Sequence, residues 1–145
     1  MMKTDENYGA LILRMSFAIM IIPHGVGKLF GIWGGFGFDK TMHHFTENLG
    51  IPFALALCAI CVEFFSSLML LVGFQTRINA LLLSIVMLVA GSMHLKHGFY
   101  MNWFGQKAAE GFEFHILALG IVLSLVFLSG GKYSLDAYLH TKDTR

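Results

Sequence analysis

Charged residues are scarce in this chain of 145 residues. Asp, Glu, Lys and Arg make up 13% of the sequence, whereas an average soluble domain carries about a quarter. Hydrophobic residues make up 56%, more than one small core could bury, so many of them must face lipid instead of water. This composition excludes a large domain outside the membrane.

An excess of positive charge is also missing, because ten Lys and Arg stand against nine Asp and Glu. The resulting net charge of +1 provides no basic field for a nucleic-acid backbone, so we expect no nucleic-acid partner. Cysteine is rare as well. Cys58 and Cys61 fall inside one apolar run, where neutral thiols are expected to pack in the core and not to act as a redox pair.

The chain does contain four apolar runs, each close to the roughly 20 residues that a helix needs to cross a membrane. The predicted spans are about Tyr8–Phe30, Ile51–Val72, Ile78–His97 and Gly111–Leu128. The short link between the second and third spans makes them an antiparallel hairpin. The sequence therefore predicts an all-α integral membrane protein with one domain over residues 1–145, a four-helix bundle of antiparallel transmembrane helices.

Lys and Arg outside the spans predict the orientation of the bundle. Lys3, Arg77, Lys132, Lys142 and Arg145 fall on one side of the membrane, and Lys40, Lys96 and Lys107 fall on the other. Because cytoplasmic segments carry the excess of Lys and Arg, both termini are expected in the cytoplasm. On the cytoplasmic side we expect a polar tail, Lys132–Arg145, and on the outer side a Gly-rich loop, Gly31–Gly50.

Several ionisable residues fall inside the spans, where a charge costs at least about 2.5 kcal/mol and needs a partner, a watery cavity or a task. Arg14, His24 and Lys28 share a stripe of about 80° on the first span. Glu63 lies near the middle of the second span, beside small residues that let another helix approach closely. The candidate ligand-binding residues are Arg14, His24, Lys28, Glu63, His94 and Glu113.

Two interpretations of these residues stay open. In the structural one, ion pairs fix which helix packs against which. In the functional one, the outer half of the bundle holds a polar pocket where a Lys or His donor and a carboxylate bind a quinone head group or relay protons. His94 and His97 have a spacing that permits metal ligation, but helix-end histidines more often bond a carbonyl, so no metal site is predicted.

Five short motifs follow one another along the chain. They are Leu13-Arg14, His24-Gly25-Val26-Gly27-Lys28-Leu29-Phe30, Gly73-Phe74-Gln75-Thr76-Arg77, Phe112-Glu113 and Gly130-Gly131-Lys132-Tyr133-Ser134-Leu135-Asp136. In this order and spacing they resemble the DoxX family of small bacterial membrane proteins, from about Ala10 to Asp136. One departure is Lys132, where the family's ending commonly has Arg, and this change keeps the positive charge.

The resemblance implies a four-helix protein of the bacterial inner membrane, related to the small subunit of quinone-linked thiosulfate oxidation systems. The family positions carried onto this chain are Arg14, His24, Lys28, Glu63, Arg77, His94 and Glu113. We therefore expect a redox-associated subunit, in a quinone-linked oxidoreductase complex, that binds a quinone-like molecule as its cofactor. Its partners would be the lipid bilayer and a redox protein or further copies of the chain. The alternative is a non-enzymatic scaffold or small-solute carrier.

Overall fold

The computed structural model describes residues 8–143, and within this range every regular element is helical. The elements are α1 (Tyr8–Phe30), α2 (Phe38–His43), the π-turn η1 (His44–Asn48), α3 (Phe53–Cys61), the π-turn η2 (Val62–Ser66), α4 (Ser67–Val72), α5 (Thr76–His94), the 3₁₀ turn η3 (Leu95–His97), α6 (Glu113–Leu128) and α7 (Leu135–Asp143). The all-α prediction is thus confirmed for the described residues.

Three helical stretches are long and apolar enough to cross a membrane, namely Tyr8–Phe30, Phe53–Val72 and Thr76–His97. The first agrees residue for residue with the predicted span, and the second combines α3, η2 and α4. α6 is apolar too, but its 16 residues extend about 24 Å, less than the roughly 30 Å of a hydrocarbon core. Length and apolar composition therefore establish three candidate spans, with α6 as a shorter apolar helix.

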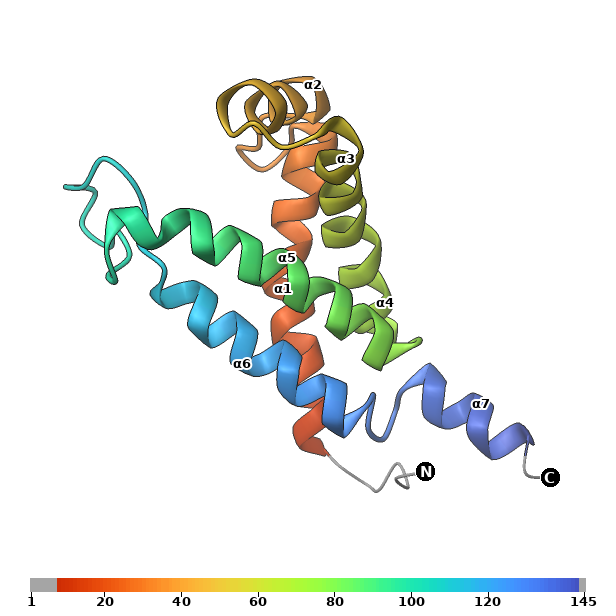
Figure 1. The fold of residues 1–145 in the computed structure, drawn as a ribbon. Coiled ribbons are helices and arrows are strands. Elements are labelled where there is room, and N and C mark those ends of the chain that lie inside the picture. Colours follow the sequence, from red (N-terminus) through yellow and green to blue (C-terminus); the bar gives the residue numbers. More distant parts are fainter. Residues whose placement is uncertain (1–7, 144–145) are drawn as a thin grey trace.

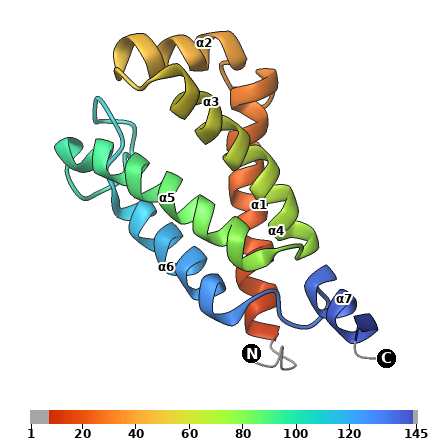
Figure 2. The same cartoon turned by 45° about the vertical axis from the view of Figure 1, so that its right-hand side comes forward.

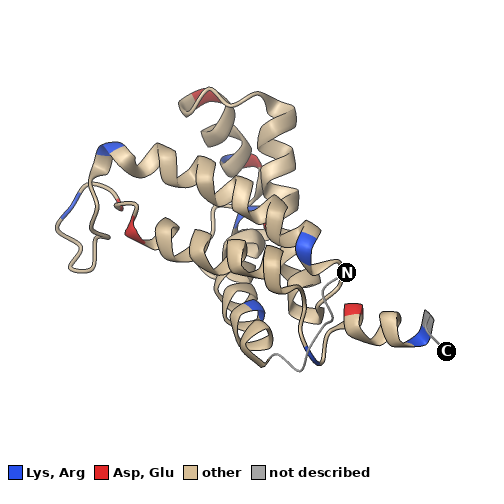
Figure 3. Cartoon of the chain, turned by 60° about the horizontal axis from the view of Figure 1, so that its bottom comes forward, with Lys and Arg blue, Asp and Glu red and all other residues tan. Residues whose placement is uncertain are grey.

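The long helices form two antiparallel pairs (Figure 1). The α3–α4 helix runs back along α1, and α6 runs back along α5. The two pairs meet near the N-terminus of α1 and diverge toward the connections at residues 31–52 and 98–112 (Figure 2). We call the end where they meet the terminal face and the opposite end the loop face. Lys, Arg, Asp and Glu lie mainly near these two ends (Figure 3).

The core is divided in the same way as the helices. A large cluster of buried residues joins α1, α4, α5 and α6, and it includes Phe17, Leu70 and Leu83. A smaller one joins α2 to α3 near the loop face. Cys58 lies outside both clusters and is exposed on α3. The expectation that this thiol packs in the core is therefore wrong, because no other part of residues 8–143 covers that side of α3.

Two connecting segments contain more helix than the sequence predicted. The expected loop Gly31–Gly50 includes α2 and η1, because Met42 is buried against Ala56 of α3. The expected polar tail Lys132–Arg145 includes α7. Its first turn is stabilised by Ser134, whose hydroxyl accepts a hydrogen bond from a backbone N–H three residues later (3.1 Å).

Arg14 ties the ends of three helices together at the terminal face. Its side chain is 1% exposed, and its guanidinium donates to four backbone carbonyls. The acceptors are those of Leu70 (3.0 Å), Leu71 (2.6 Å), Gly130 (3.1 Å) and Tyr133 (2.8 Å). Two of them belong to the last turn of α4 and two follow α6, so the cation bonds carbonyls at helix ends, where the regular helical hydrogen bonds stop. The Leu70 carbonyl also accepts from the N–H of Gly73 (3.1 Å).

Asp136 completes this junction from the start of α7. Its carboxylate accepts hydrogen bonds from the backbone N–H groups of Gln75 (2.7 Å) and Thr76 (2.9 Å), so it caps α5 from another helix. Its own N–H donates to the carbonyl of Gly73 (2.9 Å). Gly73 has a φ of +72°, and a Cβ there would lie 2.5 Å from that of Ser134, so only glycine fits this close contact.

Replacing Arg14 with Met is expected to destabilise the protein by about 3 kcal/mol or more, because several buried carbonyls lose their donor. Thermal unfolding of the purified protein in mild detergent measures this loss. The matched control is Arg77→Met, since Arg77 is exposed and makes one 3.4 Å bond to the Phe127 carbonyl. Its effect is expected to stay within about 0.5 kcal/mol. Equal stabilities of the two variants would contradict the role of Arg14.

Candidate functional site

An ion pair between Lys28 and Glu63 lies within the candidate spans. The Lys28 ammonium donates to a carboxylate oxygen of Glu63, which joins the last turns of α1 to η2. The Glu63 side chain is 5% exposed and that of Lys28 is 28% exposed. The ammonium also lies 5.7 Å from the ring centre of Phe45, within the range of a cation–π contact. The carboxylate is therefore enclosed, whereas part of the lysine reaches the surface.

Local backbone structure brings Glu63 close to α1. Glu63 is in η2, a single turn of π-helix. Such turns inside α-helices are often found at functional sites. Across from Glu63, Gly25 allows the two backbones to touch, because a Cβ there would lie 2.9 Å from Cα of Phe64. The small residues expected beside Glu63 include Ala56 and Ser66, and both are buried.

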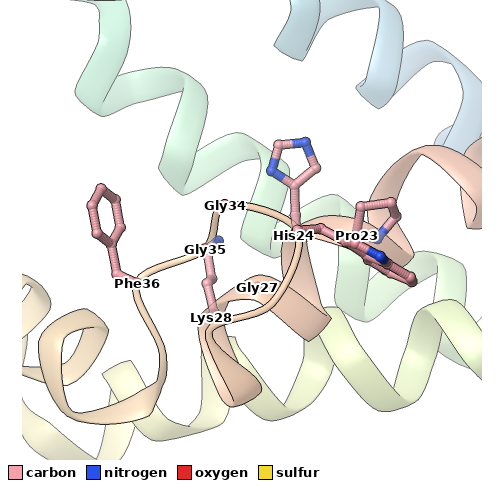
Figure 4. A pocket seen from close by; sticks show the side chains of 8 residues that line it. Pro23, His24, Gly27, Lys28, Gly34, Gly35 and Phe36 are labelled. Carbon is pink, nitrogen blue, oxygen red and sulfur yellow. The ribbon is translucent and has the colours of Figure 1, made fainter.

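An open pocket of about 340 Å³ lies beside Lys28 at the loop face. Its walls are the last turns of α1 and the segment that follows. The lining residues are Pro23, His24, Gly27, Lys28, Trp33, Gly34, Gly35 and Phe36. Figure 4 shows the side chains of His24 and Lys28 rising from α1, with Gly34 and Gly35 in the loop that crosses them. The volume of the pocket falls within the roughly 300–1,000 Å³ typical of small-molecule sites.

Glycines hold this loop against the helix. A Cβ on Gly35 would lie 2.2 Å from Cα of Gly27, so the two backbones are in direct contact. The Gly27 carbonyl accepts hydrogen bonds from the N–H groups of Gly31 (3.1 Å) and Gly37 (3.0 Å). The loop is thereby fixed over the end of α1, and it presents exposed aromatic side chains at the pocket.

Three histidines lie in ring contacts near the loop face. The ring of His24 lies 6.5 Å from that of Phe114 on α6. His94 of α5 and His115 of α6 are closer still, with ring centres 4.7 Å apart. His94 donates from Nδ1 to the Ala90 carbonyl (2.7 Å), so its Nε2 is the nitrogen left for another partner.

Three of the six candidate residues come together here: His24 and Lys28 line the pocket, and Glu63 lies behind it, paired with Lys28. His94 is on the other helix pair beside His115. Glu113 accepts a hydrogen bond from the indole N–H of Trp103 (2.8 Å), in the connection before α6. Arg14 lies in the junction at the terminal face.

Within residues 8–143, no group of three or more His, Cys, Asp or Glu side chains is placed to hold a metal ion. His94 and His97, whose spacing permits ligation, have ring centres 6.3 Å apart.

Sequence reasoning missed His115 and the loop side of the pocket. His115 lies about 200° around its helix from the candidate residue Glu113, and its neighbour is His94 on α5. The signal for the loop was the run of glycines around Trp33 and Phe36. Such a run indicates close backbone contacts, but it does not say which helix the loop contacts.

The amino-acid sequence is similar to those of known proteins. A family model described as DoxX matches residues 9–97, from α1 to η3, which includes Arg14, Lys28 and Glu63. Inner membrane protein YqjF of Escherichia coli is 28% identical over 141 residues, which cover 97% of this chain and 99% of that protein. No solved structure matches the chain. Because the family model covers more than half of its length, the chain belongs to the DoxX family.

Proposed function

We propose that this chain is a redox-associated subunit of the bacterial inner membrane and that its loop-face pocket binds the carbonyl head group of a quinone-like molecule. The observation that carries the proposal is the Lys28–Glu63 pair beside the pocket. A neutralised ammonium that is partly exposed within a span is a hydrogen-bond donor for a carbonyl oxygen and adds no net charge to the membrane.

The other lining groups fit the same ligand. His24 adds a second polar group next to Lys28, and it can donate to a carbonyl oxygen or exchange a proton. The Glu63 carboxylate is the proton acceptor nearest to that donor. Trp33 and Phe36 offer aromatic faces against which a ring can stack. Electrons would come from a partner redox protein or from the ligand itself.

The proposal also includes a location in the inner membrane and a fourth span, formed by α6. The similar Escherichia coli protein is named an inner membrane protein and aligns along nearly the whole chain. α6 runs back along α5, and Gly91 makes room for it, since a Cβ there would lie 3.0 Å from Cβ of His115. A fourth span would put both termini on one side of the membrane, and in Figure 1 the start of α1 and the helix α7 lie at the same end of the molecule.

A structural role for the charges is the second candidate, and Arg14 is the observation that favours it. Its guanidinium is enclosed by four carbonyls and lies far from the pocket. In this view the chain is a scaffold or a small-solute carrier, and the Lys28–Glu63 pair only fixes the packing of α1 against η2.

The double variant Lys28→Met, Glu63→Gln separates the two candidates. Removing both partners leaves no uncompensated buried charge, so the protein is expected to stay folded. Loss of a charged donor should lower the quinone that co-purifies in mild detergent by about tenfold or more. Mass spectrometry of extracts from the purified protein measures the bound quinone. The control is Lys40→Met, because Lys40 is exposed on α2, and this variant should retain the bound quinone.

Two results would reject the quinone pocket. One is a wild-type protein that carries phospholipid alone after purification from quinone-containing membranes. The other is a folded double variant that keeps the same amount of quinone as the Lys40→Met control. A double variant that loses quinone because it has unfolded is recognised by its thermal melting curve, and the single variant His24→Phe then provides a test that leaves the ion pair intact.

Alkaline phosphatase fused at two positions tests the proposed topology, because this enzyme becomes active only outside the cytoplasm. Fusion after Lys107 is expected to be active and fusion after Arg145 inactive, as the Lys and Arg distribution predicts. Activity at both positions would mean that α6 does not cross the membrane. Activity only after Arg145 would mean that the chain is inserted the other way round.

A further inference from the structure

α7 leaves the helix bundle sideways at the terminal face (Figures 1 and 2). Its first turn is fixed, because the N–H of Asp136 donates to the Gly73 carbonyl and its carboxylate caps α5. The link before it is fixed as well, since the carbonyls of Gly130 and Tyr133 both bond Arg14. The direction of α7 is therefore set by the same junction that closes the candidate spans.

One face of α7 is apolar and uncovered. Leu135, Tyr138 and Leu139 follow the i, i+3, i+4 spacing and are 40%, 66% and 41% exposed. His140 is on the other side of the helix, about 100° from Leu139 and about 160° from Tyr138. A helix with this pattern that begins at the end of a membrane span has a side suited to contact with acyl chains.

Cations flank this apolar face. The Lys132 ammonium lies 5.6 Å and 5.7 Å from the ring centres of Tyr8 and Tyr133, and exposed tyrosines are typical of the membrane interface. Lys142 falls on the same arc as Leu135 and Leu139, at the end of the helix, where its long side chain can extend toward head groups. The nearby Asp136 carboxylate is occupied by two backbone N–H groups.

We propose that α7 lies flat in the head-group layer of the membrane, with its apolar face toward the acyl chains and Lys132 and Lys142 on anionic phospholipid head groups. Lipid fits this face better than a second protein does. A stable protein interface buries about 1,200 Å² or more, whereas α7 offers one stripe of three side chains. The membrane that the neighbouring helices cross reaches this level without any further partner.

Fluorescent labels on opposite sides of α7 test the proposal in lipid nanodiscs, where both membrane faces are accessible. The background variant is Cys58→Ser, Cys61→Ser, into which Leu139→Cys or His140→Cys is introduced and labelled with an environment-sensitive dye. The label at position 139 is expected to emit at shorter wavelength and to be quenched several-fold less by aqueous acrylamide than the label at position 140. The thermal melting curve of each variant checks that the bundle is intact.

The lipid composition tests the charge contribution. Replacing part of the phosphatidylcholine with phosphatidylglycerol should increase the protection of position 139, and Lys132→Gln, Lys142→Gln should abolish this increase. Equal quenching at positions 139 and 140 would overturn the proposal. Equal protection in both lipid mixtures would overturn the anionic-lipid contact. Protection that disappears when the protein is held at one copy per disc would identify a second chain, and not lipid, as the occupant.

Discussion

The contact on which the rest of this molecule depends is the Arg14 guanidinium with its four carbonyls. A helix ends with carbonyls that have no partner, and in a membrane such groups are costly to leave unbonded. Here one buried cation bonds the end of α4 and the segment after α6 at the same time. Because this bonding is concentrated at the terminal face, the two helix pairs are held together there and are free to diverge at the loop face.

Arg14 and Lys28 show two ways to keep a cation inside a span, and the difference decides which of them can meet a ligand. Arg14 is enclosed by backbone carbonyls and is 1% exposed. Lys28 is neutralised by one buried carboxylate on one side, and its side chain stays 28% exposed beside an open pocket. A buried guanidinium with four of its five N–H donors bonded to the backbone is a structural element, whereas an ammonium bonded on one side has donors left for a small molecule.

The sequence predicts features that depend on local patterns, and it does not predict contacts that depend on the path of the chain. Apolar length alone predicted α1, and the cost of buried charge singled out Lys28 and Glu63, which do form a pair. The shared stripe of Arg14 and Lys28 was misleading as a sign of one site, since fourteen residues of helix separate them by about 21 Å. The contact of Gly35 with Gly27 depends on the path of a loop, and helical periodicity carries no information about it.

The junction also brings together motifs that lie far apart in the sequence. The motif that begins at Gly73 makes the turn between α4 and α5, and the motif that ends at Asp136 caps that same turn from α7. Neither is stable alone, because the turn exposes backbone N–H groups and α7 is a short helix with little packing of its own. Each motif thus provides the partner that the other lacks. A change in either one acts on the direction of α7 and on the end of the core together.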